Sequence, residues 1–326
     1  MNEREKKSIR ILSLYERLSK GELLKKDKEA RRFGVNDKTI QRDLDELRLY
    51  LASIHADSVT LEYNHTNQSY SLNRGGDVWL TNEEILALSK VLLETRAFSS
   101  EEMNALLEKI IAQSEPNDRK FIQDVIRNER YHYEPLRHER SLLQMIWDIS
   151  DAVRTKRHLK ISYKKETAGE AVTRTVKPVG LLFSEYYFYL AAFHVERDYE
   201  FPTIYRIDRI TDYEIQTEHF KVDYKNRFEE GEFRKKIQFM HSGPLTNLTF
   251  RFTGSSLQAV LDRLPTARII SKDEEGVIIE AKVFGKGIKI WLLSQGPDVE
   301  VLKPVEFREE MKESLKKMLG KYDTSI

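Results

Sequence analysis

Two stretches of the chain combine cationic, amide and aromatic side chains at spacings that suit the binding of nucleic acid. In the first, FGVNDKTIQRDLDELRLYL over residues 33–51, apolar residues recur at helical spacing and polar residues occupy the opposite face. On a helix that enters the major groove, Arg42 would pair bidentately with guanine and Gln41 with adenine. Thr39 or Lys38 would hold a phosphate.

The predicted helix has a defined start and a defined inner face. Asn36 is a natural N-cap, and Asp37 falls on the outer face or at its margin. The inner face is predicted to consist of Ile40, Leu44 and Leu47. The alternative is an ordinary amphipathic surface helix, whose acidic residues would repel DNA: Asp43, Asp45 and Glu46. The segment EARRFGV before it and a predicted hairpin after it favour DNA binding.

The second stretch is YRIDR, over residues 205–209. Arg206 and Arg209 are three residues apart and would converge on a phosphate, because guanidinium offers a planar fork of donors. Tyr189 offers a ring face and a hydroxyl. Alternation along the predicted strands adds four further candidates for the same surface: Tyr163, Arg174, Tyr187 and His194.

Basic groups interleaved with aromatic rings suit a short oligonucleotide or a nucleotide, because bases stack and phosphates attract positive charge. A structural interpretation of the same residues stays open. Tyrosine is common on half-buried strands, and Asp208 would form a salt bridge with either of the two arginines.

Composition sets the broad class. With 326 residues, two or three domains are expected, and 40% apolar with 33% charged residues describe a globular protein with a hydrated surface. The net charge is only +1, but residues 1–50 hold 14 Lys/Arg against 10 Asp/Glu, and residues 151–177 hold 8 against 3. These local excesses suggest anionic partners met at particular places. The absence of cysteine excludes disulfides, thiolate metal sites and thiol catalysis.

No apolar run has the length of a membrane span or the flanks of a signal peptide, so a cytoplasmic location without membrane contact is expected. Catalysis finds no support, because no metal-ligand pair, nucleophile elbow or phosphate-binding loop stands out. We therefore expect no enzymatic activity and no cofactor.

The elements that must position these residues follow from periodicity. Helices are predicted over residues 6–20, over residues 27–33 with Gly34 as a left-handed cap, and from Asn36 onward. VTLEY and SYSL then read as a β-hairpin around a polar loop. Residues 1–76 are thus predicted to form a winged helix-turn-helix, whose hairpin tip, including His65 and Asn67, would touch flanking phosphates or the minor groove. Gly75 and Gly76 mark a hinge.

Beyond the hinge, the predicted fold is α+β and multidomain. Residues 77–157 form a helical linker, with capping boxes at Thr81 and Ser99 and a last helix from about Glu139 to Thr155. Five short strands indicate a small barrel over residues 158–240. The order strand, helix, strand, strand, helix, strand over residues 241–326, followed by an amphipathic helix, is typical of a ferredoxin-like module.

Three blocks in the same order resemble one family of regulators. KKDKEARRFGVNDKTIQRDLDELRLYL resembles the helix-turn-helix of DeoR-like (YafY-like) regulators that carry a WYL domain. VKPVGLLFSEYYFYLAAFHVERDYEFPTIYRIDRI is similar to the WYL core, with Phe188 where the family name expects tryptophan. IKIWLLSQGPDVEVLKPVEFREEMKESLKKML is similar to the WCX-type extension of the same proteins.

The resemblance implies an Sm-like barrel that binds a ligand and controls a DNA-binding domain, with Tyr189, Arg206 and Arg209 at the ligand. We expect a homodimer that binds duplex DNA at an inverted-repeat operator and senses an anionic oligonucleotide or nucleotide. Two alternatives remain: an RNA- or single-stranded nucleic-acid-binding module that reads through the barrel, and an enzyme that acts on nucleotides.

Overall fold

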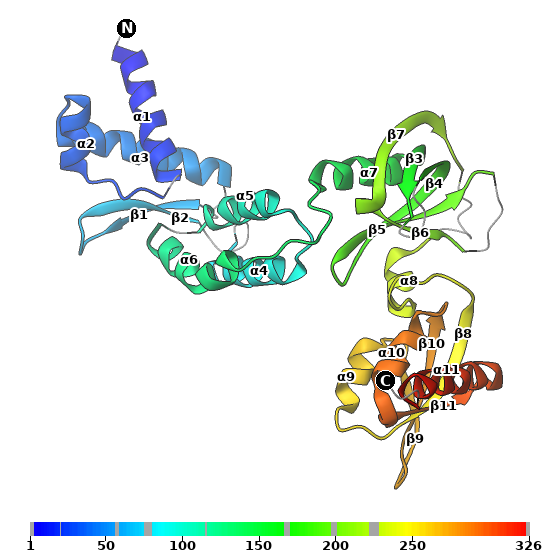
Figure 1. The fold of residues 1–326 in the computed structure, drawn as a ribbon. Coiled ribbons are helices and arrows are strands. Elements are labelled where there is room, and N and C mark those ends of the chain that lie inside the picture. The colour runs from blue at the N-terminus through cyan, green and yellow to red at the C-terminus, as the bar shows by residue number, and fades with distance from the viewer. Residues whose placement is uncertain are drawn as a thin grey trace. The chain divides into compact units, whose positions relative to one another are not determined.

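The computed structural model describes residues 3–19, 21–55, 59–74, 80–114, 116–165, 170–196, 201–221 and 228–323 (Figure 1). The predicted hinge at Gly75 and Gly76 lies outside them. The fold mixes helices with antiparallel sheets, and the chain divides into two compact units, residues 1–135 and 136–326. In the described part of the chain, no helix is long and apolar enough to cross a membrane.

The first unit begins with three helices and a hairpin. Gly34, with φ +64°, ends the second helix in the left-handed conformation, as predicted. Asn36 caps the third helix, since its Oδ1 accepts from the backbone N–H of Thr39 at 2.8 Å. The elements are α1 (Glu3–Ser19), α2 (Lys26–Phe33), α3 (Asp37–His55), β1 (Val59–Asn64) and β2 (Ser69–Arg74).

One apolar core holds these elements together, and the predicted inner face of α3 belongs to it. Ile40, Leu44 and Leu47 are at most 2% exposed. They pack with Leu14 and Leu18 of α1 and with apolar residues of α2 and the hairpin. Burial of this kind is the main source of stability in a small helical domain, so the inner face of α3 is fixed by packing.

A buried ion pair crosses the same core between α1 and α3. The Arg10 guanidinium donates from Nε and, over 3.1 Å, from a terminal nitrogen to the two carboxylate oxygens of Asp43. Both residues are buried, and Asp43 raises the pKa of Arg10 through its hydrogen bond. Two charges removed from water need each other, so this pair fixes how α1 crosses α3.

Three further helices complete the first unit: α4 (Asn82–Thr95), α5 (Ser100–Ile111) and α6 (Pro116–Tyr131). The predicted capping box at Thr81 is present, because its hydroxyl accepts from Glu84 N and the Glu84 carboxylate accepts from Thr81 N. At Ser99 the hydroxyl accepts from Glu102 N at 3.2 Å. Local sequence signals therefore set where these helices begin.

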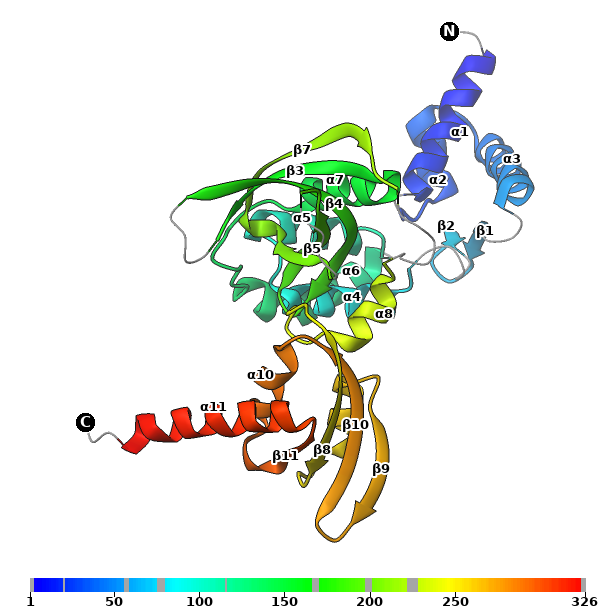
Figure 2. The same cartoon turned by 90° about the vertical axis from the view of Figure 1, so that its right-hand side faces the viewer.

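The second unit opens with α7 (Leu143–Thr155) and a five-stranded antiparallel sheet in the order β6-β5-β4-β3-β7. Figure 2 shows α7 beside strands β3, β4, β5 and β7 of this sheet. The helix begins later than the predicted Glu139, whose φ of +49° breaks the helical path. Its buried residues pack against β3 and β4 in one apolar cluster. The strands are β3 (Arg157–Lys164), β4 (Ala171–Ser184), β5 (Tyr187–His194), β6 (Thr203–Arg206) and β7 (Ile210–His219), with a 3-10 turn η1 (Ile207–Arg209) before β7.

A short helix, α8 (Glu230–Lys236), lies against β4 and was not predicted. Its Glu230 carboxylate accepts from Leu181 N at 2.9 Å, beside a β-bulge between Pro178 and Gly180. Gly180 has no room for a Cβ, which would come within 2.9 Å of the Glu230 and Phe228 side chains. With one buried side chain in seven residues, α8 is too short to show a helical period.

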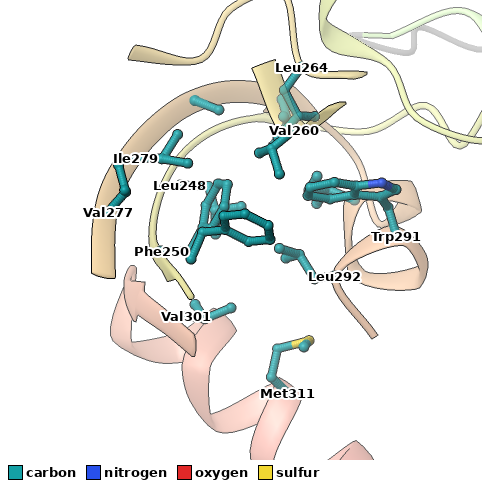
Figure 3. Close-up of a cluster of buried hydrophobic side chains, with 14 residues drawn as sticks. Leu248, Phe250, Val260, Leu264, Val277, Ile279, Trp291, Leu292, Val301 and Met311 are labelled. Atoms are coloured by element: carbon teal, nitrogen blue, oxygen red, sulfur yellow. The ribbon is translucent and has the colours of Figure 1, made fainter. Parts of the chain in front are cut away.

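The C-terminal part has the element order that the sequence predicted. Its sheet runs β11-β8-β10-β9, and α9, α10 and α11 contribute to one apolar cluster with the inward residues of the strands (Figure 3). All six residues of β9 are exposed, and its pairing with β10 is irregular at Ile278 and Ile279. The elements are β8 (Leu245–Phe252), α9 (Leu257–Arg263), β9 (Arg268–Asp273), β10 (Gly276–Phe284), α10 (Gly287–Ser294), β11 (Val299–Lys303) and α11 (Val305–Asp323).

The buried pair of α1 and α3 yields a stability prediction. Asp43→Ala leaves the Arg10 charge buried without its partner and should lower the free energy of unfolding by about 3–5 kcal/mol. Glu46→Ala removes the partner of Lys7 in an exposed pair on the same helices and should cost about 0–1 kcal/mol. Urea unfolding of both variants measures the difference; equal losses would show that burial of the pair is not what matters.

Candidate nucleic-acid interface

The amino-terminal end of α3 presents a polar surface on the side away from the core. Asn36, Asp37, Lys38 and Arg42 are exposed, and Thr39 is half-buried. The Thr39 hydroxyl donates to Asn36 Oδ1 at 2.9 Å, so the side chains of these two residues are occupied in the cap. The groups left facing solvent are cationic apart from Asp37.

Lys38 and Arg42 have no ion-pair or hydrogen-bond partner within the described residues. Both are long side chains on adjacent turns of one helix face. An unpaired guanidinium at this place keeps its planar fork of donors available for an external acceptor.

The acidic residues that weighed against DNA binding are each paired with a cation. Asp43 is bound to Arg10 in the core and does not reach the surface. Asp45 accepts from Arg48 at 3.0 Å, and Glu46 accepts from Lys7. Their negative charges are therefore largely balanced within the unit, which removes most of the expected repulsion.

Gln41 differs from its neighbours because its side-chain amide is engaged inside the unit. Its Oε1 accepts from Tyr70 Oη at 2.8 Å and from Lys26 Nζ at 3.0 Å, and its Nε2 donates to Asp45 at 3.0 Å. Reading an adenine through Gln41 would require these bonds to be exchanged. Lys26, which sequence reasoning did not select, also lies 5.9 Å from the Tyr63 ring centroid. Its only sequence signal was its position in a basic run.

The tip of the β1–β2 hairpin carries His65 and Asn67, and both are exposed. Asn67 Oδ1 accepts from the backbone and the hydroxyl of Ser69, so this side chain shapes the turn. The His65 ring lies edge-on to Tyr63, with centroids 4.9 Å apart. Both residues belong to the same compact unit as the exposed face of α3.

In the second unit, the five-stranded sheet brings together Tyr187, Tyr189 and Arg206. Tyr189 pairs with Arg206 across strands β5 and β6. The Arg206 guanidinium lies 3.4 Å from the centroid of the Tyr187 ring, and the Tyr187 and Tyr189 rings meet edge-on at 6.3 Å. This cluster is an aromatic surface with one cation stacked on it.

Asp208 already holds the cation of this cluster. Arg206 Nε and a terminal nitrogen donate to the two Asp208 oxygens at 3.1 and 2.7 Å. Asp208 is buried, and its own carbonyl accepts from Arg140 at 3.2 Å. The salt bridge that the sequence left open is thus made with Arg206. An anionic ligand would have to share or replace this partner.

The other predicted ligand residues do not join the same cluster. Tyr163 and His194 contact Tyr205, whose hydroxyl lies 2.9 Å from His194 Nε2. Tyr205 belongs to the apolar core with α7, Tyr163 packs against that core, and His194 is half-buried. Tyr205 and Arg206 are adjacent on β6 and therefore point to opposite faces. Arg174 is half-buried on β4 opposite Ile161, and Arg209 is half-buried in η1.

The buried phenol of this cluster gives a prediction about pH. Burial raises the pKa of Tyr189 to about 12, and the nearby Arg206 lowers it by a smaller amount. Because tyrosine in an unfolded chain has a pKa of about 10, the protonated Tyr189 stabilises the fold fully below about pH 10. That stability is lost as the pH rises from about 10 to 12.

Tyr189→Phe should therefore lose less stability than the wild type between those two pH values, measured by denaturant unfolding at a series of pH values. Tyr213→Phe is the matched comparison, since burial and Asp148 also raise the pKa of Tyr213 to about 12. The double variant should show the flattest profile. A Tyr189→Phe profile parallel to that of the wild type would contradict the assignment.

Two domain families match parts of the chain: the WYL domain over residues 144–215 and the WCX domain over residues 244–319.

Proteasome accessory factor B/C (PafBC) of Arthrobacter aurescens is similar at 17% identity with a TM-score of 0.30, over 91% of this chain and 46% of that one. A CRISPR Cas-related protein is similar at 17% identity with a TM-score of 0.37, over 67% and 61%. The chain thus spans less than two thirds of either structure. No curated protein matches it. The chain therefore contains a WYL domain, which includes the five-stranded sheet, and a WCX domain at the C-terminal sheet.

Proposed function

We propose that this protein is a ligand-responsive transcriptional regulator that binds duplex DNA through α3. The observation that carries the proposal is the outer face of α3, where Lys38 and Arg42 have no partner among the described residues. Three carboxylates of the same helix are paired, those of Asp43, Asp45 and Glu46. A recognition helix needs this combination: an inner face fixed by packing and an outer face with available donors.

In this proposal residues 1–74 act as a winged helix-turn-helix. Arg42 contacts a guanine edge in the major groove, and Lys38 contacts a phosphate. The hairpin tip, with His65 and Asn67, touches the flanking backbone or the minor groove. A homodimer would present two such helices, so the operator would be an inverted repeat with half-sites about one helical turn apart.

The WYL domain supplies the sensor in this proposal, as an Sm-like barrel. Tyr187 and Tyr189 offer ring faces for a base, and Arg206 offers a donor fork for a phosphate. A phosphate that binds Arg206 competes with Asp208, so occupancy would free a buried carboxylate. The sensor performs no catalysis in this account, and its ligand is a short oligonucleotide or a nucleotide.

Regulation then requires only that the ligand bind the DNA-competent and DNA-incompetent states with different affinities. By linkage, DNA must shift ligand affinity by the same factor. The same scheme applies to an activator and to a repressor.

The DNA-reading role of Arg42 is tested by Arg42→Ala. Loss of a bidentate base contact should weaken binding to the operator by about 1–3 kcal/mol and leave non-specific binding much less affected. The measurement is a fluorescence anisotropy titration with DNA from the protein's own upstream region and with a scrambled duplex, at several salt concentrations.

Lys38→Ala is the matched control on the same helix face. It should weaken binding to both duplexes and lower the salt dependence by about one counterion. If Arg42→Ala behaves in the same way as Lys38→Ala, Arg42 is a phosphate contact. Preference of the wild type for single-stranded RNA would favour the RNA-binding alternative.

The sensor is tested by Arg206→Ala, with Arg209→Ala beside it. The Arg206 variant should lose the effect of added oligonucleotide on DNA binding while keeping the operator affinity measured without ligand, and the Arg209 variant tests whether the ligand also reaches η1 outside the cluster. Arg174→Ala is the control and should respond normally. Arg174 lies on β4 opposite Ile161 of β3 and has no ion pair among the described residues. A normal response from the Arg206 variant would leave its pairing with Asp208 as a purely structural contact.

A further inference from the structure

A cavity of about 480 Å³, which the proposed function does not use, is lined mainly by the WCX domain and also by Glu185 of the WYL domain and by Phe239. Its walls include three aromatic rings, those of Phe239, Phe252 and Trp291. Polar groups at its rim come from the loop before α9 and from the segment after α10: Ser255, Ser256, Gln295 and Asp298. The volume lies in the range of small-molecule sites, and the lining combines aromatic rings with polar and charged side chains.

Trp291 gives this cavity a donor without a partner. The side chain is only 7% exposed, and its ring meets Phe250 edge-on in the core of the domain, with centroids 6.3 Å apart (Figure 3). Within the described residues nothing accepts a hydrogen bond from its indole N–H. This nitrogen is not one of the buried side-chain atoms that lack a partner among the described residues, so it reaches solvent and is available to donate to a ligand.

Asp298 gives the cavity an acceptor without a cation. No ion pair or side-chain hydrogen bond to its carboxylate exists among the described residues. The backbone carbonyl of Asp298 accepts from Thr253 N at 2.9 Å, which holds this residue beside the end of β8. Gly254 allows the close approach, since a Cβ there would lie 2.9 Å from Asp298 Oδ2.

Arg263 closes one side of the cavity in a fixed position. Its guanidinium lies 5.1 Å from the centroid of the Phe239 ring, and its nitrogens donate to Gln238 Oε1 at 2.9 Å and to Glu185 at 3.0 Å. Because Glu185 balances this charge, the cavity does not offer net positive charge to a simple anion. Its chemistry is that of stacking and of directed hydrogen bonds.

The backbone at this side of the cavity is strained. Phe239 and Glu185 line the cavity with φ of +49° and +59°, and Met240 follows with +53°. Non-glycine residues in this conformation are costly and concentrate at binding and active sites.

We propose that this cavity binds a nucleobase, and guanine in preference to the other bases. Aromatic walls receive the planar ring, and the indole N–H of Trp291 donates to a ring acceptor. The Asp298 carboxylate accepts from adjacent N–H groups, which guanine presents on one edge. The base belongs to a free nucleotide or to the end of an oligonucleotide, which offer the same chemistry.

This cavity adjoins the sensor cluster at Glu185, whose charge also acts on Tyr189, but its walls do not include Arg206 and the proposal does not depend on the proposed function. It is tested by intrinsic fluorescence of the full chain. Trp79→Phe and Trp147→Phe leave Trp291 as the sole tryptophan, at the cavity wall. Guanosine monophosphate should change its emission saturably, more strongly than the adenosine, cytidine and uridine monophosphates.

Two substitutions test the geometry. Asp298→Asn keeps the shape but removes the charged acceptor, and should weaken binding of guanosine monophosphate by about tenfold or more. Ala259→Phe fills the cavity from α9 and should abolish binding, whereas Gln258→Phe, at the neighbouring exposed position outside the cavity wall, should not. Thermal melting of each variant checks that the domain remains folded.

Trp291→Phe, followed by equilibrium dialysis with labelled nucleotide, replaces the indole by a smaller ring without the N–H donor and should weaken binding about three- to tenfold. A trinucleotide ending in guanine that binds more tightly than the mononucleotide identifies a nucleic-acid end, and equal affinity identifies a free nucleotide. Arg206→Ala should leave this binding unchanged. The proposal is overturned if no nucleotide changes Trp291 emission saturably, or if binding survives Ala259→Phe but is lost in Arg206→Ala.

Discussion

The ion pair between Arg10 and Asp43 determines how α1 packs across α3 in the first three helices. Each charge is removed from water and is stable there only with the other, so α1 and α3 have one favourable crossing. The pair also consumes an acidic residue of α3 that would otherwise add negative charge beside Arg42. One interaction thus fixes the helix from inside and changes the electrostatic character of its outside.

The same principle operates in the WYL domain with the opposite result. Asp208 neutralises Arg206 at the surface cluster, so the cation there is already bound before any ligand arrives. On α3, salt bridges within the protein engage acidic side chains and leave cationic side chains available. On the sheet, the salt bridge engages the cationic side chain itself. The first arrangement suits constant attraction to a polyanion, and the second suits an exchange between partners that a ligand can drive.

Short-range signals made much of the fold predictable. The Gly34 cap, the Asn36 cap and the Thr81 capping box depend on a few neighbouring residues, and all three are present. The strands and the C-terminal element order followed from periodicity. Helix α8 was missed because its position is set by the contact of Glu230 with a bulge in β4, which is 49 residues away in sequence.

The candidate sites were less predictable, because residue types do not reveal which partners a side chain has within the fold. Gln41 has the right chemistry for adenine, yet Tyr70 and Lys26 occupy its oxygen. Alternation along single strands could not show that Tyr163 and His194 contact Tyr205 whereas Tyr187 lies on the other face with Arg206. The cavity beside Trp291 unites residues of β8, α9 and α10 with residues of the β4–β5 turn and of connecting segments, and it left no motif in the sequence.

The exposed strand β9 is an edge of its sheet, and such edges can recruit strands from other molecules. It carries Ile269 and Ile270, whose apolar side chains are half or more exposed. The irregular pairing leaves Ile270 as an extra residue opposite β10, which interrupts the even row of backbone donors and acceptors. With Arg268 and Lys272 beside it, this edge offers a poor template, so the bulge protects the domain against aggregation through its least covered strand.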